Sequence, residues 1–365
     1  MLAGGLLAPT LAAAVSGLPA QYAPERFRTG EYRASWALDM IHAADAYALG
    51  YTGKGVRVGV VDSGDTLTHP EFAGRTGPFI PNERRRLQLT GEAGSHSTSV
   101  SGLLAAARDG RGMHGVAYDA LLIPVRGGNS DSASQTYIAM RDAIDGGAKV
   151  INASYGTDEY LIDFVGSGNE DRYRFNEEAV KTFVLSGESG GLRQLSEEAA
   201  SVRYAAAHGA VVVYTAGNDY LEHPVAASNV SGYGLLPYIR REHHDSGVYQ
   251  FVDDAELADA LESADYPDSI VPLDSSDSRL AGFDFSDLER DMIVVVALGP
   301  DGKIASYSNR CGVAWRWCIA APGGDVPADW VSWQGSAMYT TDSKGGYKLE
   351  GSIGTSYAAP LVSGA

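Results

Sequence analysis

The chain has 365 residues, of which 44% are hydrophobic and 20% are charged, so it can bury a full core and does not have the composition of a disordered protein. Its formal net charge of −18 at pH 7 argues against nucleic acid and anionic membranes as partners, because a polyanion repels both. The two cysteines, Cys311 and Cys318, are too few for a four-ligand zinc site. They would form a disulfide in an oxidising compartment and remain free thiols in the cytosol.

The N-terminal segment, residues 1–21, is apolar and rich in small residues. It is similar to the hydrophobic region and cleavage zone of a signal peptide, although the usual preceding basic residues are missing. A disordered or tag-like N-terminus is the alternative. Because export leads to an oxidising compartment, we expect the two cysteines to be bonded to each other. No other stretch approaches the length of a transmembrane helix, so we expect no direct membrane insertion.

The remaining chain alternates between two kinds of hydrophobic pattern. Residues 22–36 are mixed and polar, which predicts an extended arm. Short β-branched or apolar runs predict buried strands, whereas apolar residues at helical spacing predict helices. The predicted strands are residues 56–61, 121–125, 150–153, 210–215 and 293–297. The predicted helices are residues 37–49, 96–107, 133–144 and 197–208, followed by a helix start near residue 356.

Strands and helices in this order predict an α/β fold with a doubly wound, mostly parallel sheet. Two long stretches, residues 157–195 and 220–291, do not fit the alternation, and we interpret them as insertions, the first irregular and the second partly structured. The domain would then span residues 22–365. Asp62, Ser154 and Asn218 each follow a predicted strand, so a parallel sheet would bring them to one edge, where ligands bind in such folds.

The segment Gly354-Thr355-Ser356 places a hydroxyl at the start of a helix. Unpaired N–H groups and the positive end of the helix dipole can stabilise an oxyanion there, so the hydroxyl could attack a carbonyl. Pro360 would fall near the first turn, where its missing N–H costs little. Taken alone, the segment is more typical of an ordinary helix cap, and the rest of the chain reverses that preference.

Asp62, His96 and Ser356 stand in the order aspartate, histidine, serine along the chain. Serine is a weak nucleophile and needs a base, histidine has a suitable pKa for that base, and a carboxylate can orient the imidazole. Separately, a strand-end aspartate is often a cap, and His96 could be a helix-start residue with a satisfied ring. His69, beside Pro70, is the competing histidine, and we expect it to be structural or at the rim.

These motifs resemble the subtilisin-like serine proteases, the subtilases. The resemblance is carried by Val60-Val61-Asp62-Ser63-Gly64, the segment around His96, Ala216-Gly217-Asn218 and Gly354-Thr355-Ser356-Tyr357-Ala358-Ala359-Pro360. It implies a subtilisin-like fold and a triad of Asp62, His96 and Ser356, with Asn218 in the oxyanion hole. It further implies that Ser154, Tyr155 and Gly156 bind the substrate backbone. No cofactor or metal is required, although calcium often accompanies the family.

A closer resemblance is to the subtilase passenger domains of bacterial autotransporters. It is carried by residues 48–56 and by the segments around Cys311 and Cys318, residues 306–312 and 317–323. It implies a secreted or cell-surface location in a bacterium, reached through a C-terminal barrel that this chain does not include. The chain ends nine residues after Ser356, so we expect it to be truncated after the nucleophile helix begins, which leaves its own activity open.

The sequence departs from the family pattern at a few positions. Ser97 stands where glycine is usual, Ser99 stands where a second histidine is common, and Tyr357 replaces a methionine or a smaller apolar residue. Tyr357 could narrow the site or alter access for the leaving group.

The predicted function is that of a secreted serine endopeptidase acting as a monomer on protein or peptide substrates. The alternative is a catalytically silent subtilase-like surface module whose insertions bind a protein partner. Esterase or lipase chemistry is disfavoured because no Gly-x-Ser-x-Gly elbow surrounds Ser356.

Overall fold

The computed structural model describes most of the chain between residues 22 and 365. The described ranges are 22–64, 67–77, 94–127, 133–155, 162–164, 183–186, 189–221, 224, 226–240, 249–252, 271–272, 284–327, 329 and 331–365. Residues 1–21 lie outside them, as do most residues of the two predicted insertions.

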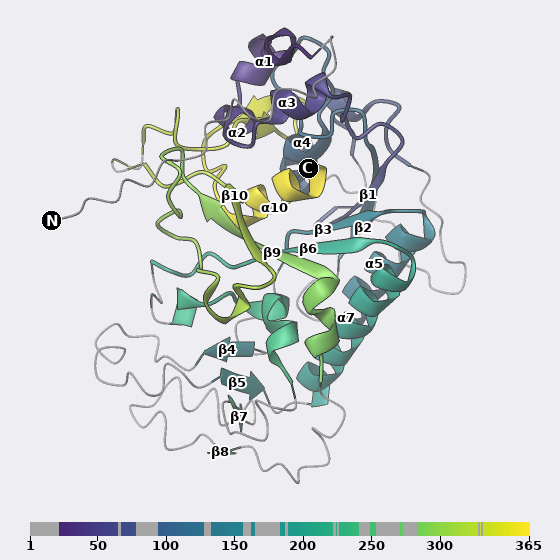
Figure 1. The fold of residues 1–365 in the computed structure, drawn as a ribbon, viewed down its shortest axis with the longest axis vertical. Helices are drawn as coiled ribbons and strands as arrows, with labels where there is room; N and C mark the ends of the chain where they lie inside the picture. The colour runs from purple at the N-terminus through teal and green to yellow at the C-terminus, as the bar shows by residue number, and fades with distance from the viewer. Residues whose placement is uncertain are drawn as a thin grey trace, which may run out of the picture.

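A six-stranded parallel sheet forms the centre of the molecule, with strand order β10-β9-β6-β3-β1-β2 (Figure 1). Its strands are β1 (Arg57–Asp62), β2 (Leu121–Arg126), β3 (Val150–Ala153), β6 (Val211–Thr215), β9 (Met292–Leu298) and β10 (Cys318–Pro322). A smaller sheet contains β4 (Ile162–Phe164), β5 (Phe183–Ser186), β7 (Tyr249–Val252) and β8 (Val271–Pro272). The α/β prediction is therefore confirmed.

Helices cover both faces of the large sheet (Figure 1). On one face lie α4 (Ser95–Ala105) and α10 (Thr355–Gly364), and on the other lie α5 (Ala133–Asp145) and α7 (Ser189–Ala207). The short helices α1 (Gly30–Arg33), α2 (Trp36–Met40) and α3 (Ala43–Ala48) pack beyond α4 and α10. The 3₁₀ turns are Pro24–Phe27, Pro70–Phe72, Ala226–Ser228, Gly232–Tyr238, Ser286–Arg290 and Gly312–Ala314.

The two hydrophobic layers follow from the alternation of side chains along each strand. In β9, Val294 and Val296 pack with the α5 and α7 layer, whereas Val295 and Ala297 pack with the α10 layer. A strand buried on both faces must be apolar throughout, which is why these runs could be recognised in the sequence. Helix α10 is itself covered on both sides, so its first turn is held firmly over the sheet.

The predictions for the N-terminal region were partly wrong. Residues 22–36 are not an extended arm, because they contain the turn Pro24–Phe27 and helix α1. The single helix predicted at residues 37–49 is broken into α2 and α3 at His42, which has a left-handed φ of 56°. Apolar spacing continues across the break, so the periodicity alone does not reveal it.

The two predicted insertions also need correction where they are described. Helix α7 begins at Ser189, inside the stretch predicted as irregular, residues 157–195. Within 220–291, the turn Gly232–Tyr238 is buried and packs against the α7 layer through Leu235 and Leu236. This part of the second stretch therefore belongs to the core.

Strand β10 and the hairpin of β11 (Thr340–Thr341) and β12 (Tyr347–Lys348) were not predicted. The hairpin strands are very short, and β10 contains two alanines and a proline in place of a β-branched run. Cys311 and Cys318 form a disulfide with Cα atoms 5.7 Å apart, as expected.

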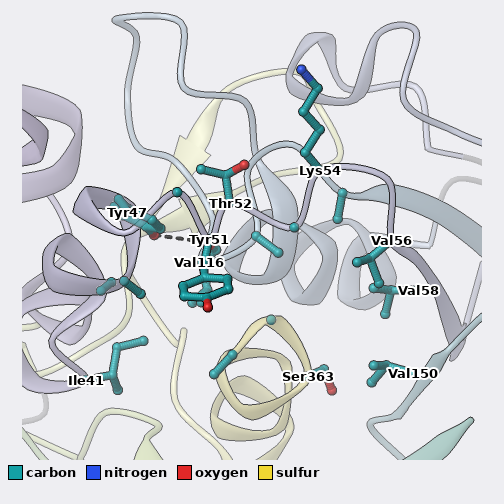
Figure 2. A pocket seen from close by; sticks show the side chains of 18 residues that line it. Ile41, Tyr47, Tyr51, Thr52, Lys54, Val56, Val58, Val116, Val150 and Ser363 are labelled. Carbon is teal, nitrogen blue, oxygen red and sulfur yellow. Dashed lines mark hydrogen bonds between the residues drawn. The ribbon is translucent and has the colours of Figure 1, made fainter. Parts of the chain in front are cut away.

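A pocket of about 340 Å³ lies at the C-terminal end of α10 (Figure 2). Tyr51, Val58, Val150 and Ser363 are among the residues that line it. It lies at the end of α10 opposite to Ser356, so it is separate from the polar cluster described next.

Candidate active site

Asp62 and His96 form the centre of the polar cluster. Asp62 ends β1, its side chain is buried, and both of its carboxylate oxygens lie 2.9 Å from Nδ1 of His96. A carboxylate can only accept, so Nδ1 carries the proton and Nε2 is left as the basic nitrogen. One Asp62 oxygen also accepts the backbone N–H of Ser63 at 2.6 Å, which fixes the carboxylate.

His96 lies in the first turn of α4, which begins at Ser95. Gly94 precedes this helix, and a Cβ atom there would lie only 2.5 Å from Oγ of Ser63. The absence of a side chain at Gly94 therefore lets the start of α4 approach the end of β1, which brings the imidazole to Asp62. The imidazole side chain is 36% exposed, so it remains open to a substrate.

Ser356 is the second residue of α10, after the turn residue Gly354 with a φ of 148°. It precedes Tyr357, whose ring centroid lies 5.9 Å from that of His96 in an edge-to-face arrangement. Within the described residues, the Ser356 hydroxyl and His96 are not hydrogen-bonded to each other. Such bonds are often long in enzymes without substrate and shorten when a substrate binds.

Pro360 has a different position from the one predicted. It lies inside α10 rather than in the first turn, so it removes the N–H that would bond the carbonyl of Ser356 four residues earlier. The hydroxyl of Ser154 replaces that donor, at 3.1 Å from the Ser356 carbonyl oxygen. A residue predicted for substrate binding thus also holds the backbone of the residue predicted as nucleophile.

A buried chain of hydrogen bonds supports Ser154. The Asn152 amide donates to Oγ of Ser154 at 2.9 Å, and the Ser363 hydroxyl donates to Oδ1 of Asn152 at 2.9 Å. Asn152 is fully buried in β3, and Ser363 lies at the far end of α10. The strand and the helix are therefore joined at two points. Sequence reasoning missed Asn152 and Ser363, although a polar Asn152 in an apolar strand was a visible signal.

Asn218 contacts the residue just before Ser356. Its Oδ1 accepts the backbone N–H of Thr355 at 2.8 Å and the Thr355 hydroxyl at 3.0 Å. A backbone N–H can only donate, so this atom must be the carbonyl oxygen, and the Nδ2–H₂ group points elsewhere. Sequence reasoning did not single out Thr355.

The loop that carries Asn218 is held by Asn309. Gly217 has a φ of 105°, and its carbonyl oxygen accepts the backbone N–H of Asn309 at 3.1 Å. The Asn309 side chain in turn accepts the N–H of Asp219 at 2.8 Å. A Cβ atom on Gly217 would lie 2.6 Å from Nδ2 of Asn309, so both the backbone angle and the packing require glycine.

Tyr155 leads into a buried acidic group behind the site. Its hydroxyl donates to Oε1 of Glu198 at 2.8 Å, and the hydroxyl of Tyr214 donates to the same oxygen. Burial raises the pKa of Glu198 to about 7, more than the two hydroxyl donors lower it. The pKa values of both tyrosines are also raised by burial. Glu198 was not predicted, since a glutamate on a helix usually faces solvent.

The remaining predicted residues are placed as follows. His69 is buried away from the cluster, where its Nε2–H donates to the Gly346 carbonyl at 2.8 Å and Nδ1 accepts the Glu71 N–H at 3.2 Å. It is structural, as expected. Gly156 lies outside the described residues.

In the part of the chain that the structure describes, no three His, Cys, Asp or Glu side chains gather as a metal site would require. No helix within the same ranges is both long and apolar enough to span a bilayer.

A parallel α/β sheet that carries aspartate, histidine and serine at its carboxyl edge, in this order along the chain, is typical of the subtilisin-like serine endopeptidases. The profile of the Subtilase family matches residues 53–365, and the chain belongs to this family. An extracellular serine protease of Serratia marcescens is 26% identical over 374 residues, which cover 94% of this chain and 30% of that protein. The minor extracellular protease Vpr of Bacillus subtilis (strain 168) is 26% identical over 390 residues, or 89% of this chain and 47% of Vpr. The chain therefore spans less than half the length of these two relatives.

Solved structures show the same fold. The nisin leader peptidase NisP of Lactococcus lactis has a TM-score of 0.56 and 21% identity, with 91% of this chain and 82% of that chain covered. The epidermin leader peptide processing protease EpiP of Staphylococcus aureus has a TM-score of 0.53 and 18% identity, with 92% and 70% covered.

Proposed function

We propose that this chain is a serine endopeptidase domain that hydrolyses peptide bonds through an acyl-enzyme intermediate. The observation that carries the proposal is the contact of both Asp62 oxygens with Nδ1 of His96 at 2.9 Å, beside the helix start that presents Ser356. The proposed base, the group that orients it and the proposed nucleophile then come from three different elements of the fold, α4, β1 and α10.

In the first step, the Ser356 hydroxyl attacks the carbonyl carbon of the scissile peptide bond while Nε2 of His96 takes the hydroxyl proton. The imidazolium is stabilised by Asp62, which itself stays ionised. His96 then gives this proton to the nitrogen of the leaving amine, and the C–N bond breaks. Water, deprotonated by the same imidazole, hydrolyses the resulting ester and regenerates the Ser356 hydroxyl.

Asn218 and the backbone N–H of Ser356 would hold the oxyanion. The support is the orientation of the Asn218 amide, whose oxygen is occupied by Thr355 so that the Nδ2–H₂ group is left for substrate. A donor held in place before the charge develops lowers the barrier without reorganisation. In subtilisin, a relative of this chain, loss of one such donor lowers turnover by about 10²–10³-fold.

Ser154, Tyr155 and Gly156 follow β3 in the sequence, and we propose that they bind the acyl part of the substrate as an added strand. We therefore expect extended protein or peptide substrates. The relatives named above are proteases by their names, which supports this substrate class.

The decisive experiment is labelling with a fluorophosphonate probe, which reacts with activated serines. The parent chain should be labelled, Ser356→Ala should not be, and the exposed control Ser343→Ala should be labelled like the parent. Equal labelling of Ser356→Ala and the parent would refute the assignment of the nucleophile.

The alternative of a catalytically silent binding module is less well supported, because a scaffold without activity has no physical need for a buried carboxylate aligned on an imidazole. Casein hydrolysis that is lost in Ser356→Ala would exclude it. A folded parent chain that is neither labelled by the probe nor able to hydrolyse casein would favour it.

We extend the proposal to the cellular location, the oligomeric state and the cofactors. We propose that residues 22–365 form one catalytic domain that acts as a monomer outside the cell, secreted or displayed at the bacterial surface as in autotransporters, after removal of residues 1–21 as a signal. The extracellular relatives and the disulfide support export. N-terminal sequencing of the exported protein and its elution volume on a sizing column would test this.

We propose no cofactor for catalysis, and unfolding with and without a calcium chelator would reveal a structural calcium ion.

A further inference from the structure

The ammonium group of Lys348 lies beside the residue that follows the nucleophile. Its Nζ donates to the hydroxyl of Tyr357 at 3.4 Å and lies 5.9 Å from the centroid of the Tyr357 ring. The same ring lies edge-to-face with His96 at 5.9 Å. Lys348, Tyr357 and His96 thus form a continuous row that ends at the imidazole.

The backbone fixes Lys348 in this position. Lys348 pairs with Thr340 across the β11–β12 hairpin, and the Thr340 hydroxyl donates to the carbonyl of Ser99 at 2.6 Å. The neighbouring Thr341 donates to the carbonyl of Thr98 at 2.8 Å. Both threonines are fully buried against α4, the helix that carries His96. The hairpin is therefore attached to the same helix as the proposed base.

The charge of Lys348 has no carboxylate partner among the described residues. The lysine is half-buried, and no aspartate or glutamate in the described ranges forms an ion pair with it. In a chain with a net charge of −18, such a cation next to the reaction centre is unusual. It is available for a negative group on the substrate.

The position of the row relative to the two halves of a substrate follows from the proposed mechanism. His96 must face the leaving amine, because it donates the proton to that nitrogen. Asn218 and Ser154 contact α10 on the side of Thr355 and the Ser356 carbonyl, where the acyl half is held. Tyr357 lies against His96 instead, and Lys348 lies against Tyr357, so the two side chains line the side of the leaving amine.

Resting on the proposed function, we propose that Lys348 determines specificity for an acidic side chain in the first or second residue after the scissile bond. The carboxylate of this aspartate or glutamate pairs with the ammonium group while the Tyr357 hydroxyl fixes its direction. A half-exposed ion pair of this kind contributes about a two- to fivefold preference.

The test uses the full chain and measures only how the leaving-amine side of the site selects among amine acceptors. An activated ester first acylates Ser356, and C-terminally amidated amino acids then compete with water for the acyl group. Attack by the amine forms the peptide bond and releases the Ser356 hydroxyl. Glutamate and aspartate amides should be preferred over glutamine amide by about two- to fivefold. Glutamine with a free α-carboxylate is a further acceptor. If it is preferred over glutamine amide as strongly as glutamate amide is, the site recognises a chain terminus and not an acidic side chain.

Lys348→Met should remove the preference for acidic acceptors, and Lys348→Glu should transfer it to lysine amide. Lys344→Glu is the matched control, because it makes the same charge change on the same hairpin at an exposed position. If the Lys348 variants lower transfer to all acceptors equally, Lys348 is only structural and the proposal is overturned. If the parent is not acylated at all, the proposed function itself fails.

Discussion

The hydroxyl of Ser154 donates to the carbonyl oxygen of Ser356 at 3.1 Å, although the two residues are 202 positions apart in the chain. Inside an ordinary helix, that carbonyl would accept the N–H four residues later, but the residue there is Pro360. The helix start that presents Ser356 is therefore completed by a strand-end side chain and not by the helix itself. The contact ties the nucleophile's backbone to the edge of the sheet.

Because both residues act on the carbonyl of Ser356, we expect the stability effects of mutations at Ser154 and Pro360 to be coupled in a double-mutant cycle. Ser154→Ala should lower the free energy of unfolding by about 1–3 kcal/mol, because it leaves the Ser356 carbonyl without a donor. Pro360→Ala supplies a helical N–H to the same carbonyl, so in that background Ser154→Ala should cost about 1 kcal/mol less. Urea unfolding of the four proteins measures the coupling. Strict additivity would mean that the carbonyl does not connect the two sites.

Asp62→Asn should lower kcat/KM for a peptide substrate by about 10⁴-fold while leaving the fold intact. An amide can donate to Nδ1 and thereby favour the wrong tautomer of His96, in which Nε2 carries the proton and cannot act as a base. Steady-state kinetics with circular dichroism separates the two effects. Asp301→Asn serves as the control, because this carboxylate is exposed and pairs with Lys303. A loss of less than about tenfold would contradict the role of Asp62.

Glu198 predicts a pH dependence of stability. Its pKa is about 7 in the folded chain against an ordinary value of 4.5, so between these values the folded state binds more protons than the unfolded state. The free energy of unfolding should therefore be highest below the ordinary pKa and fall as pH rises through about 7, by at most about 3 kcal/mol.

Glu198→Gln keeps an oxygen acceptor for Tyr155 and Tyr214 but cannot ionise, so most of this slope should disappear. Denaturant unfolding across about pH 4 to 8 measures it, and Glu350→Gln, an exposed substitution, is the control. An unchanged slope in Glu198→Gln would show that another group causes the pH dependence.

The disulfide predicts a sensitivity to reduction. Cys311 and Cys318 are seven positions apart, and closing a loop of this length lowers the entropy of the unfolded chain by an amount worth about 2–3 kcal/mol. Dithiothreitol should lower the unfolding midpoint of the parent. The double variant Cys311→Ser and Cys318→Ser should start at the lower value and not respond to the reductant. A parent that is equally stable in both conditions would contradict this account.

The sequence alone was sufficient for the α/β class and for five strands of the central sheet, and the resemblance to subtilases implied the contact of Asp62 with His96. Strands buried on both faces must be apolar, so β1, β2, β3, β6 and β9 could be located within a residue or two, and parallel pairing brings their carboxyl ends to one edge. It was not sufficient where local signals conflict with packing. The break at His42 leaves the apolar spacing intact, and the turn Gly232–Tyr238 has the composition of a loop but is buried in the core.

Only the tertiary structure decided which side chains support the candidate site. These side chains make contacts between elements or across turns, which no periodicity encodes. The contacts are those of Thr355 with Asn218, Asn309 with the loop at Gly217, Ser363 with Asn152, and Lys348 with Tyr357. Hydrophobic pattern depends on neighbours within a few positions, and it therefore determines helices, strands and their order. A hydrogen bond between distant residues depends on how two finished elements pack, and that geometry exists only in the folded chain.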